Sequence, residues 1–328
     1  MFINFTRRKM LALSTTAMLS LASQYASAAP PENYPKSLRI VVPYSVGGGT
    51  DIIARHLAER LRQQTGVPTI VENKPGANGV IGTDLVAKST PDGGTLVLVV
   101  NSHLLNPIVM RNLPFDTFKD LQGVTQVAVS PLVLVTGVKN EGSNALEFLA
   151  AARKNKLDVS YGSSENMTRL VGNMFIKEGK LDAVHIPYKG GGPLMTDVAA
   201  GVTMLGVTSV LSAKQLIDSG RIKALAITGT ERSKILPDTP TFKEMGMEGF
   251  DNVTTSYSLY GPSAIPMSTL NSLQGAVAQV LATNDMRSIL AAQAATPVGN
   301  SVPDFQKQVT RDFEFWKKLA VENNLDKE

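Results

Sequence analysis

Short apolar runs of strand length alternate with helical stretches along the chain, and this alternation limits the possible folds more than any other feature. Residues 95–101 (TLVLVVN) contain only Val and Leu between their ends, whereas residues 51–65 place Ile52, Leu57 and Leu61 on one helical face. Such apolar strands, separated by helices, are typical of an α/β fold with mostly parallel sheets flanked by helices. We expect strands at 38–43, 67–72, 95–101, 123–138, 159–162, 183–186, 203–207 and 224–228, and helices at 51–65, 81–89, 145–154, 168–178, 194–200, 213–219, 268–282, 285–292 and 302–323.

The first 28 residues have the order of a secretory signal peptide. Residues 7–9 are basic, residues 10–23 are apolar and uncharged, and residues 26–28 (ASA) are small at the positions that signal peptidase recognises. The apolar stretch is short for a membrane span, which needs about 20 residues. No Cys follows it, so a lipid anchor at this place is excluded. We expect cleavage after Ala28 and export.

The composition argues against several classes of function. Three of the 32 Lys and Arg residues and none of the 28 Asp and Glu residues lie in the first 28 positions, so the remainder carries a net charge of +1. This balance does not favour a nucleic-acid partner. The absence of Cys excludes disulfides, thiolate nucleophiles and Cys-based metal sites. His56, His103 and His185 lack metal-ligand spacing, and no motif points to a catalytic base, so we predict no metal, no cofactor and no enzymatic activity.

Two glycine triplets each stand between a predicted strand and a predicted helix. Gly47-Gly48-Gly49 precedes Thr50 and Asp51, either of which can cap the helix that follows. Free backbone N–H groups and the helix dipole attract an anion such as a carboxylate or a phosphate. The segment fits neither the dinucleotide-binding fingerprint nor the P-loop. A turn that serves only packing is the alternative, and the motif by itself leaves both open.

The second triplet lies in residues 185–193 (HIPYKGGGP), where Tyr188 offers an aromatic ring and Lys189 a cation. It also follows a predicted strand and precedes a predicted helix. Ligands of such folds bind beyond the carboxyl ends of the strands. The two triplets therefore suggest two walls of one cleft.

Seven motifs, taken in order, resemble the substrate-binding proteins of tripartite tricarboxylate transporters, the Bug family of periplasmic receptors. They extend over nearly all of the chain beyond residue 28. They are residues 34–43 (YPKSLRIVVP), 47–51 (GGGTD), 71–77 (VENKPGA), 87–93 (AKSTPDG), 185–193 (HIPYKGGGP), 220–226 (GRIKALA) and 237–241 (PDTPT).

The resemblance implies a periplasmic binding protein of two domains, similar to the type II class, which closes on its ligand about a hinge. A length of 328 residues also favours about two domains. Domain 1 is expected at residues 29–128 plus 256–328, and domain 2 at residues 129–255. The implied function is capture of a small carboxylate in the periplasm by a monomer, for delivery to inner-membrane subunits of a tripartite tricarboxylate transporter. The alternative is a periplasmic sensor subunit that passes its loaded form to a signalling partner.

The resemblance also implies where the ligand binds. Backbone N–H groups and bridging waters at the first triplet would hold one carboxylate, and the second domain would supply the opposite wall. Carried over by position, the expected ligand-binding residues are Tyr44, Ser45, Gly47, Gly48, Gly49, Thr50, Asp51, Asn101, Ser102, His103, Ser163, Ser164, Pro187, Tyr188, Lys189 and Gly190.

Two segments depart from the family pattern. Residues 163–169 (SSENMTR) form a shortened loop in which Arg169 stands where the family has His, and Thr208 takes the place of an acidic residue. Both changes favour a ligand with a second carboxylate, held by hydroxyl groups of the far domain and by Arg169 or Lys189. An aromatic diacid is a candidate. An amino acid is less expected, because its ammonium group would require an acidic partner in the cleft.

Overall fold

The computed structural model describes residues 30–292, 294–323 and 325, and the predicted signal peptide lies outside them. One sheet runs through the molecule in the order β2-β1-β3-β9-β4-β7-β5-β6, with β8 and β10 also paired to β4. The strands are β1 (Leu38–Val42), β2 (Thr69–Asn73), β3 (Thr95–Val100), β4 (Leu121–Gly137), β5 (Val159–Ser163), β6 (Ala183–Pro187), β7 (Leu205–Ser209), β8 (Ile222–Ile227), β9 (Thr254–Pro262) and β10 (Thr296–Pro297).

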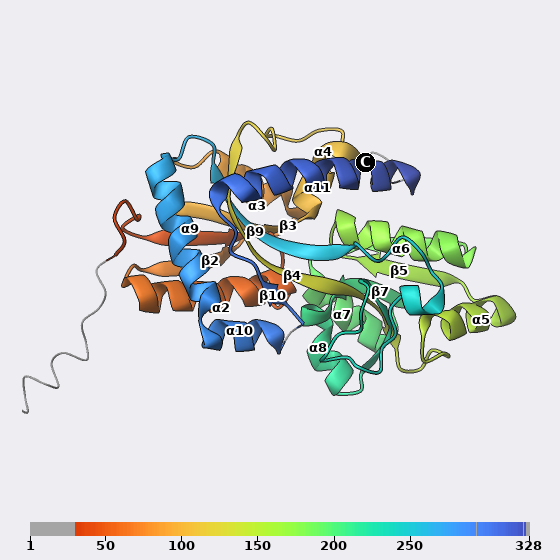
Figure 1. Cartoon of the computed structure of the whole chain (residues 1–328). Helices are drawn as coiled ribbons and strands as arrows, with labels where there is room; N and C mark the ends of the chain where they lie inside the picture. The colour runs from red at the N-terminus through yellow and green to blue at the C-terminus, as the bar shows by residue number, and fades with distance from the viewer. Residues whose placement is uncertain (1–29, 293, 324, 326–328) are drawn as a thin grey trace, which may run out of the picture.

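The sheet is mixed rather than parallel throughout. The alternating pattern gives parallel pairs on both flanks, where β1 pairs with β2 and β3, and β5 with β6 and β7. In the centre, β9 pairs antiparallel with β3 and β4, and β4 pairs antiparallel with β7 and β8. The 17-residue β4 pairs with β9 through its first part and with β7 and β8 through its last part. It therefore connects the two halves of the molecule in Figure 1.

Helices cover the sheet at nearly all the predicted positions. The pattern did not reveal α4 and β9, nor the short elements η2, η3 and β10. β9 (TTSYSLYGP) alternates Ser and Thr with larger residues instead of forming an apolar run, and α4 contains Pro107. The helices are α2 (Gly49–Thr65), η2 (Ala77–Gly79), α3 (Val80–Ala87), α4 (Ser102–Val109), α5 (Ala145–Asn155), α6 (Asn166–Gly179), α7 (Gly191–Ala200), α8 (Val210–Asp218), η3 (Lys243–Met245), α9 (Met267–Ala282), α10 (Asn284–Ala291) and α11 (Val302–Glu322).

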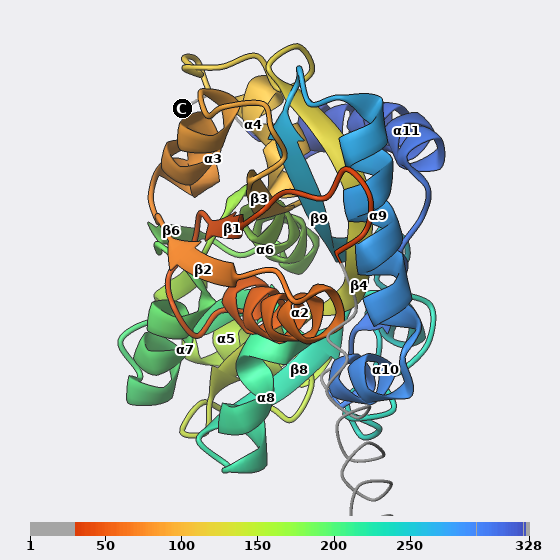
Figure 2. The same ribbon diagram turned by 90° about the vertical axis from the view of Figure 1, so that its left-hand side faces the viewer.

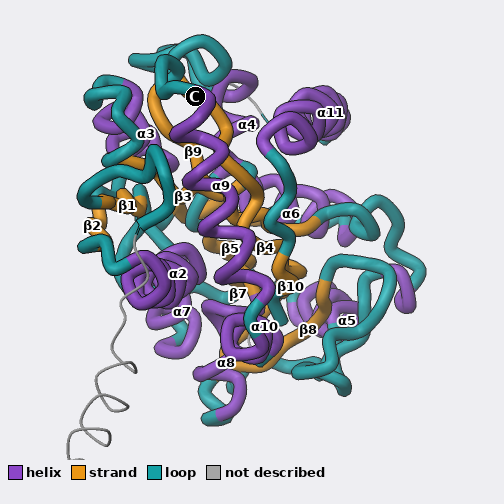
Figure 3. Tube along the Cα trace, turned by 60° about the vertical axis from the view of Figure 1, so that its left-hand side comes forward, coloured by secondary structure: helices purple, strands orange, loops and turns teal. Residues whose placement is uncertain are grey.

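Two large apolar clusters form the core. In the first, Leu57 and Leu61 of α2 pack with Leu273 of α9 above the β1–β3 part of the sheet. Figure 3 shows α2 and α9 lying next to each other there. The second cluster surrounds Phe175 of α6, and it also contains Trp316 of α11. The C-terminal helix therefore packs against the far half of the molecule as well as its own.

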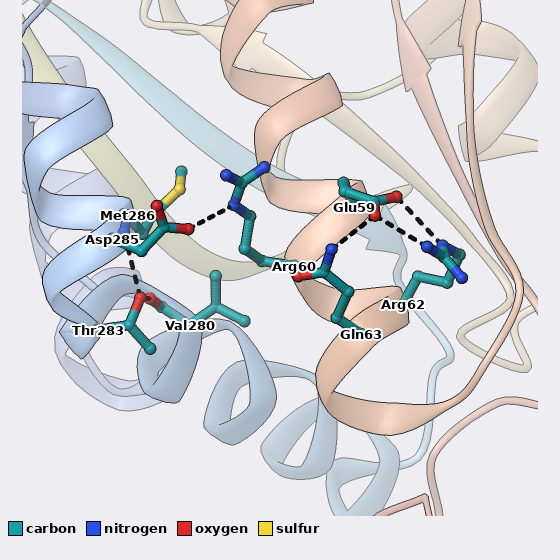
Figure 4. A network of polar contacts seen from close by, with 8 residues as sticks. All are labelled: Glu59, Arg60, Arg62, Gln63, Val280, Thr283, Asp285 and Met286. Atoms are coloured by element: carbon teal, nitrogen blue, oxygen red, sulfur yellow. Dashed lines mark hydrogen bonds and ion pairs between the residues drawn. The ribbon is translucent and has the colours of Figure 1, made fainter. Parts of the chain in front are cut away.

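The outer face of α2 is tied to α10 by polar contacts (Figure 4). Arg60 of α2 donates to Asp285 at the start of α10 over 2.9 Å. Nearby on α2, Arg62 and Gln63 both donate to Glu59. Such exposed pairs contribute only about 0–1 kcal/mol each, so burial of the α2 apolar face holds this helix in place.

Candidate functional site

A cavity of about 40 Å³ lies where the two halves of the molecule meet. The carboxyl ends of β1, β3, β5 and β7 lead to it, as expected for a ligand site in an α/β sheet. Its lining consists mostly of hydroxyl side chains and glycines. The lining residues are Tyr44, Gly48, Gly49, Thr50, Val100, Leu132, Ser164, Glu165, Thr168, Gly190, Gly191, Thr208, Ser209, Ser212, Thr255 and Tyr257.

Four helices begin at this cavity. The N-cap residues of α2, α6, α7 and α8 are Gly48, Glu165, Gly190 and Ser209, and all four are in its lining. The first N–H groups of a helix have no partner within the helix, and its N-terminus carries a partial positive charge. The starts of α6 and α8 are capped by Glu165 and Ser209, whereas α2 and α7 have no side-chain cap. The uncapped starts of α2 and α7 therefore make the cavity a site for an anion.

The first glycine triplet brings the α2 backbone against the far half of the molecule. The N–H of Gly49 donates to Ser212 Oγ of α8 over 2.8 Å. A Cβ at Gly49 would lie 2.6 Å from the Tyr257 hydroxyl oxygen and 2.7 Å from Ser209 Oγ. Only glycine permits this approach.

Asp51 braces the first loop and does not cap α2. The helix begins at Gly49, so Thr50 and Asp51 lie within its first turn, and the predicted cap at either residue is wrong. The carboxylate of Asp51 accepts from the N–H of Gly47 over 3.0 Å and from the side chains of Arg55 and Asn73. Burial alone would raise the pKa of Asp51, but these hydrogen bonds lower it overall, so the carboxylate stays ionised.

The second triplet packs directly on the first loop. Ser45 donates to the Lys189 carbonyl oxygen from its N–H over 3.2 Å and from its hydroxyl over 3.1 Å. A Cβ at Gly190 would lie 2.9 Å from the Ser45 backbone nitrogen. These contacts place the starts of α2, α7 and α8 together, as Figure 2 shows.

Glu165 is the acidic side chain of the cavity. It is 6% exposed, and it caps α6 by accepting from the N–H of Met167 over 2.7 Å and of Thr168 over 3.1 Å. Burial raises its pKa to about 7, although the two cap bonds act in the opposite direction. Among the described residues that line the cavity, it is the only acid, and none is Lys, Arg or His.

The structure brings part of the expected site together in the cavity. The residues concerned come from the loop after β1, the start of α2, the loop after β5, the start of α7 and the end of β7. They are Tyr44, Gly48, Gly49, Thr50, Ser164, Gly190 and Thr208.

Two other expected residues, Asn101 and Ser102, hold neighbouring elements together outside the cavity lining. The Asn101 side-chain amide donates to the Thr254 carbonyl oxygen over 2.7 Å, which holds the end of β3 to β9. Ser102 Oγ accepts from the N–H of Met167 over 2.9 Å, so α4 contacts the start of α6. The remaining expected residues outside the lining are Ser45, Gly47, Asp51, His103, Ser163, Arg169, Pro187, Tyr188 and Lys189.

His103 and Tyr188 make contacts with residues outside the cavity lining. The His103 ring lies between Phe115 and Tyr260, and burial lowers its pKa to about 4, so it is a neutral core residue at neutral pH. The Tyr188 hydroxyl donates to Asp197 over 2.8 Å and also contacts Thr203.

The lining also contains residues that the expected site did not include. Thr255 and Tyr257 lie on β9, and Ser209 and Ser212 lie at the start of α8. The Ser-x-x-Ser spacing of the last pair is a recognisable helix start, because Ser is a favoured N-cap. The additional lining residues are Val100, Leu132, Glu165, Thr168, Gly191, Ser209, Ser212, Thr255 and Tyr257.

Residues 30–292, 294–323 and 325 contain no group of three or more His, Cys, Asp or Glu side chains placed to hold a metal ion. Within the same residues, every helix is too short or too polar to span a bilayer.

Comparison with known proteins decides the family. The model of the family described as "Tripartite tricarboxylate transporter family receptor" matches residues 53–325. The chain belongs to this family. The receptor is 33% identical over 272 residues to protein BugT of Bordetella pertussis, covering 81% of this chain and 83% of BugT. It is 29% identical over 328 residues to a UPF0065 protein of Pseudomonas sp. encoded in the tcbD-tcbE intergenic region, and the match covers 98% of this chain and 96% of that protein.

Solved structures agree with this assignment. Periplasmic binding protein BugD superposes with a TM-score of 0.85 at 28% identity, covering 90% of the receptor and 100% of BugD. R. palustris Rpa4515 with adipate gives a TM-score of 0.84 at 28% identity, and the match covers 88% of the receptor and 97% of Rpa4515. The resemblance noted in the sequence and the periplasmic-binding-protein fold are therefore confirmed.

Proposed function

We propose that this receptor captures a short carboxylate in the cavity between its halves and delivers it to the membrane subunits of a tripartite transporter. The observation that carries the proposal is the convergence of four helix N-termini, two of them without a side-chain cap, on one small cavity. The adipate bound to the R. palustris relative supports a carboxylate as the ligand class. The lining offers hydroxyl groups and backbone N–H groups for binding, and we propose no catalytic step.

The proposed mechanism is closure of two domains on the ligand. We assign residues 29–128 plus 256–328 to domain 1 and residues 129–255 to domain 2, with β4 and β9 crossing between them. The contacts from Gly49 to Ser212 and from Ser45 to Lys189 join the two proposed domains at the cavity. A ligand that bridges the same elements would stabilise this closed arrangement.

The proposed ligand is short and aliphatic. On the measure used for buried water, one molecule needs about 10–15 Å³, so a cavity of about 40 Å³ admits few atoms. Arg169 and Lys189 are absent from the described lining, so the cavity lacks the cation that the diacid hypothesis required. An aromatic diacid would need both a larger cavity and that cation.

We further propose that the receptor is made with a signal peptide ending at Ala28, and that it acts in the periplasm as a monomer without a lipid anchor. The basic, apolar and small-residue order of the first 28 positions supports cleavage there.

A binding screen tests the proposed function. Thermal unfolding is measured with a panel of carboxylates of two to six carbons, and hits are titrated by calorimetry. A true ligand at 100 times its Kd should stabilise the receptor by about 2.7 kcal/mol. The Gly49→Ala variant should lose most of this affinity, because its Cβ would collide with Tyr257 and Ser209. Wild-type affinity in that variant would show that the ligand binds elsewhere.

A further inference from the structure

Glu165 is an unusual choice for the end of a helix in this protein. The side chains that cap α5, α8, α10 and α11 are Asn144, Ser209, Thr283 and Ser301. Asn, Ser and Thr are the residues that N-caps favour, together with Asp. Glu165 is thus a less common cap, although it completes a capping box with Thr168.

The position of Glu165 is also unfavourable for an isolated charge. Its side chain is buried, and burial is the largest influence on its pKa, with no neighbouring cation among the contributing groups. A buried charge without a partner destabilises a folded protein strongly. A bound ligand can supply the missing partner, because the side chain lines the cavity.

The carboxylate retains hydrogen-bonding capacity toward the ligand. One oxygen accepts from Met167 N–H and the other from Thr168 N–H. The Thr168 side chain also hydrogen-bonds to this carboxylate. A carboxylate has about four acceptor sites, so about one remains for the ligand. A positively charged group that donates a hydrogen bond satisfies both needs at once.

We propose that Glu165 selects ligands that carry an ammonium group close to the carboxylate, so that this receptor captures a small amino acid. The proposal rests on the proposed function. The ligand carboxylate binds at the starts of α2 and α7, and its ammonium group binds Glu165 at the start of α6. The acidic partner that an amino acid requires is thus present in the cleft, although the position of Thr208 had suggested its loss.

The other titratable groups around Glu165 keep one charge state near neutral pH. Tyr44 after β1 and Tyr257 on β9 have pKa values raised far above their usual range by burial, so both remain neutral. Burial lowers the pKa of His103 on α4 to about 4, and the pKa of Asp51 on α2 is also lowered. Arg169, further along α6, and Lys189, before α7, lie outside the cavity lining. Changes of binding with pH in this range therefore report on Glu165.

Matched ligand pairs test the proposal. Calorimetry compares acetate with glycine, propanoate with alanine, succinate with aspartate, and glutarate with glutamate, on the wild type and on Glu165→Gln. In at least one pair, the wild type should bind the amino member about tenfold tighter or more. Glu165→Gln should reduce that ratio to within about threefold, while Glu147→Gln, at the exposed start of α5, should keep it. Glu165→Asn, which restores a favoured N-cap without charge, covers the case in which the Gln variant does not fold.

The pH dependence provides the second readout. Amino-acid affinity should rise from about pH 5.5 to about pH 8, because a protonated Glu165 must release its proton to bind an ammonium group. The Gln variant should show no such rise. The proposal would be overturned if the plain carboxylates bound more tightly than the amino acids and if their affinity fell as pH rises. Glu165 would then donate its proton to a second carboxylate. Equal binding of both members of every pair would overturn it too, while leaving the proposed function intact. Binding of none of the eight compounds would overturn the proposal, and the wider panel of carboxylates would then decide the proposed function.

Discussion

Replacement of Glu165 by Gln should make the ligand-free receptor more stable at neutral pH. Gln has the shape of the protonated carboxyl and cannot ionise. It keeps one oxygen for the two N–H groups that Glu165 caps, so one cap bond is lost at every pH. The rise of the Glu165 pKa from 4.5 to about 7 corresponds to about 3 kcal/mol, because one pKa unit is worth about 1.4 kcal/mol.

The sign of the effect follows from proton binding. The folded protein holds this proton more tightly than the unfolded chain, so between pH 4.5 and about 7 the folded state binds more protons. The contribution of the group to stability is fully present below pH 4.5 and is lost as pH rises through about 7. The Gln variant does not lose stability in this way, because Gln does not titrate. Its free energy of unfolding, relative to the wild type, should therefore increase by about 3 kcal/mol between about pH 4 and about pH 8.

Urea unfolding of both proteins at a series of pH values measures this difference, because groups common to both cancel. Glu147→Gln is the control. The side chain of Ser143, followed by its N–H, lowers the pKa of the exposed Glu147, so this variant should lose stability relative to the wild type as pH rises. A Glu165→Gln difference that stays constant across the series would refute the argument that burial governs Glu165.

Further predictions concern closure and export. Ser212→Ala removes the acceptor of the Gly49 N–H and should destabilise the closed arrangement by about 1 kcal/mol. The ligand should therefore bind more weakly. An unchanged affinity would mean that water replaces the hydroxyl. Small-angle scattering should give a smaller radius of gyration with saturating ligand, whereas an identical profile would argue against domain closure. N-terminal sequencing of the exported protein should begin at Ala29, and Met1 retained in a membrane fraction would contradict the predicted signal peptide.

The positions of most strands, most helices and both glycine triplets were available from the sequence alone. Apolar periodicity reflects which residues an element buries, and the glycine triplets mark places where the backbone makes close contacts. The family was also available, because its motifs follow in order along the chain. β9 was not predicted, because its alternating Ser and Thr residues become buried only through pairing with β3 and β4.

Only the tertiary structure decided which residues of segment 163–169 face the ligand. The sequence singled out Ser163, Ser164 and Arg169, whereas the structure places Ser164, Glu165 and Thr168 in the cavity lining. The reason is the start of α6: with Glu165 as its N-cap, each later residue is rotated by about 100° around the helix axis. The same sequence with a start one residue later would present a different face. Local patterns thus determined that a loop and a helix occur here, but the packing of α6 against α4 and β5 determined the chemistry of the site.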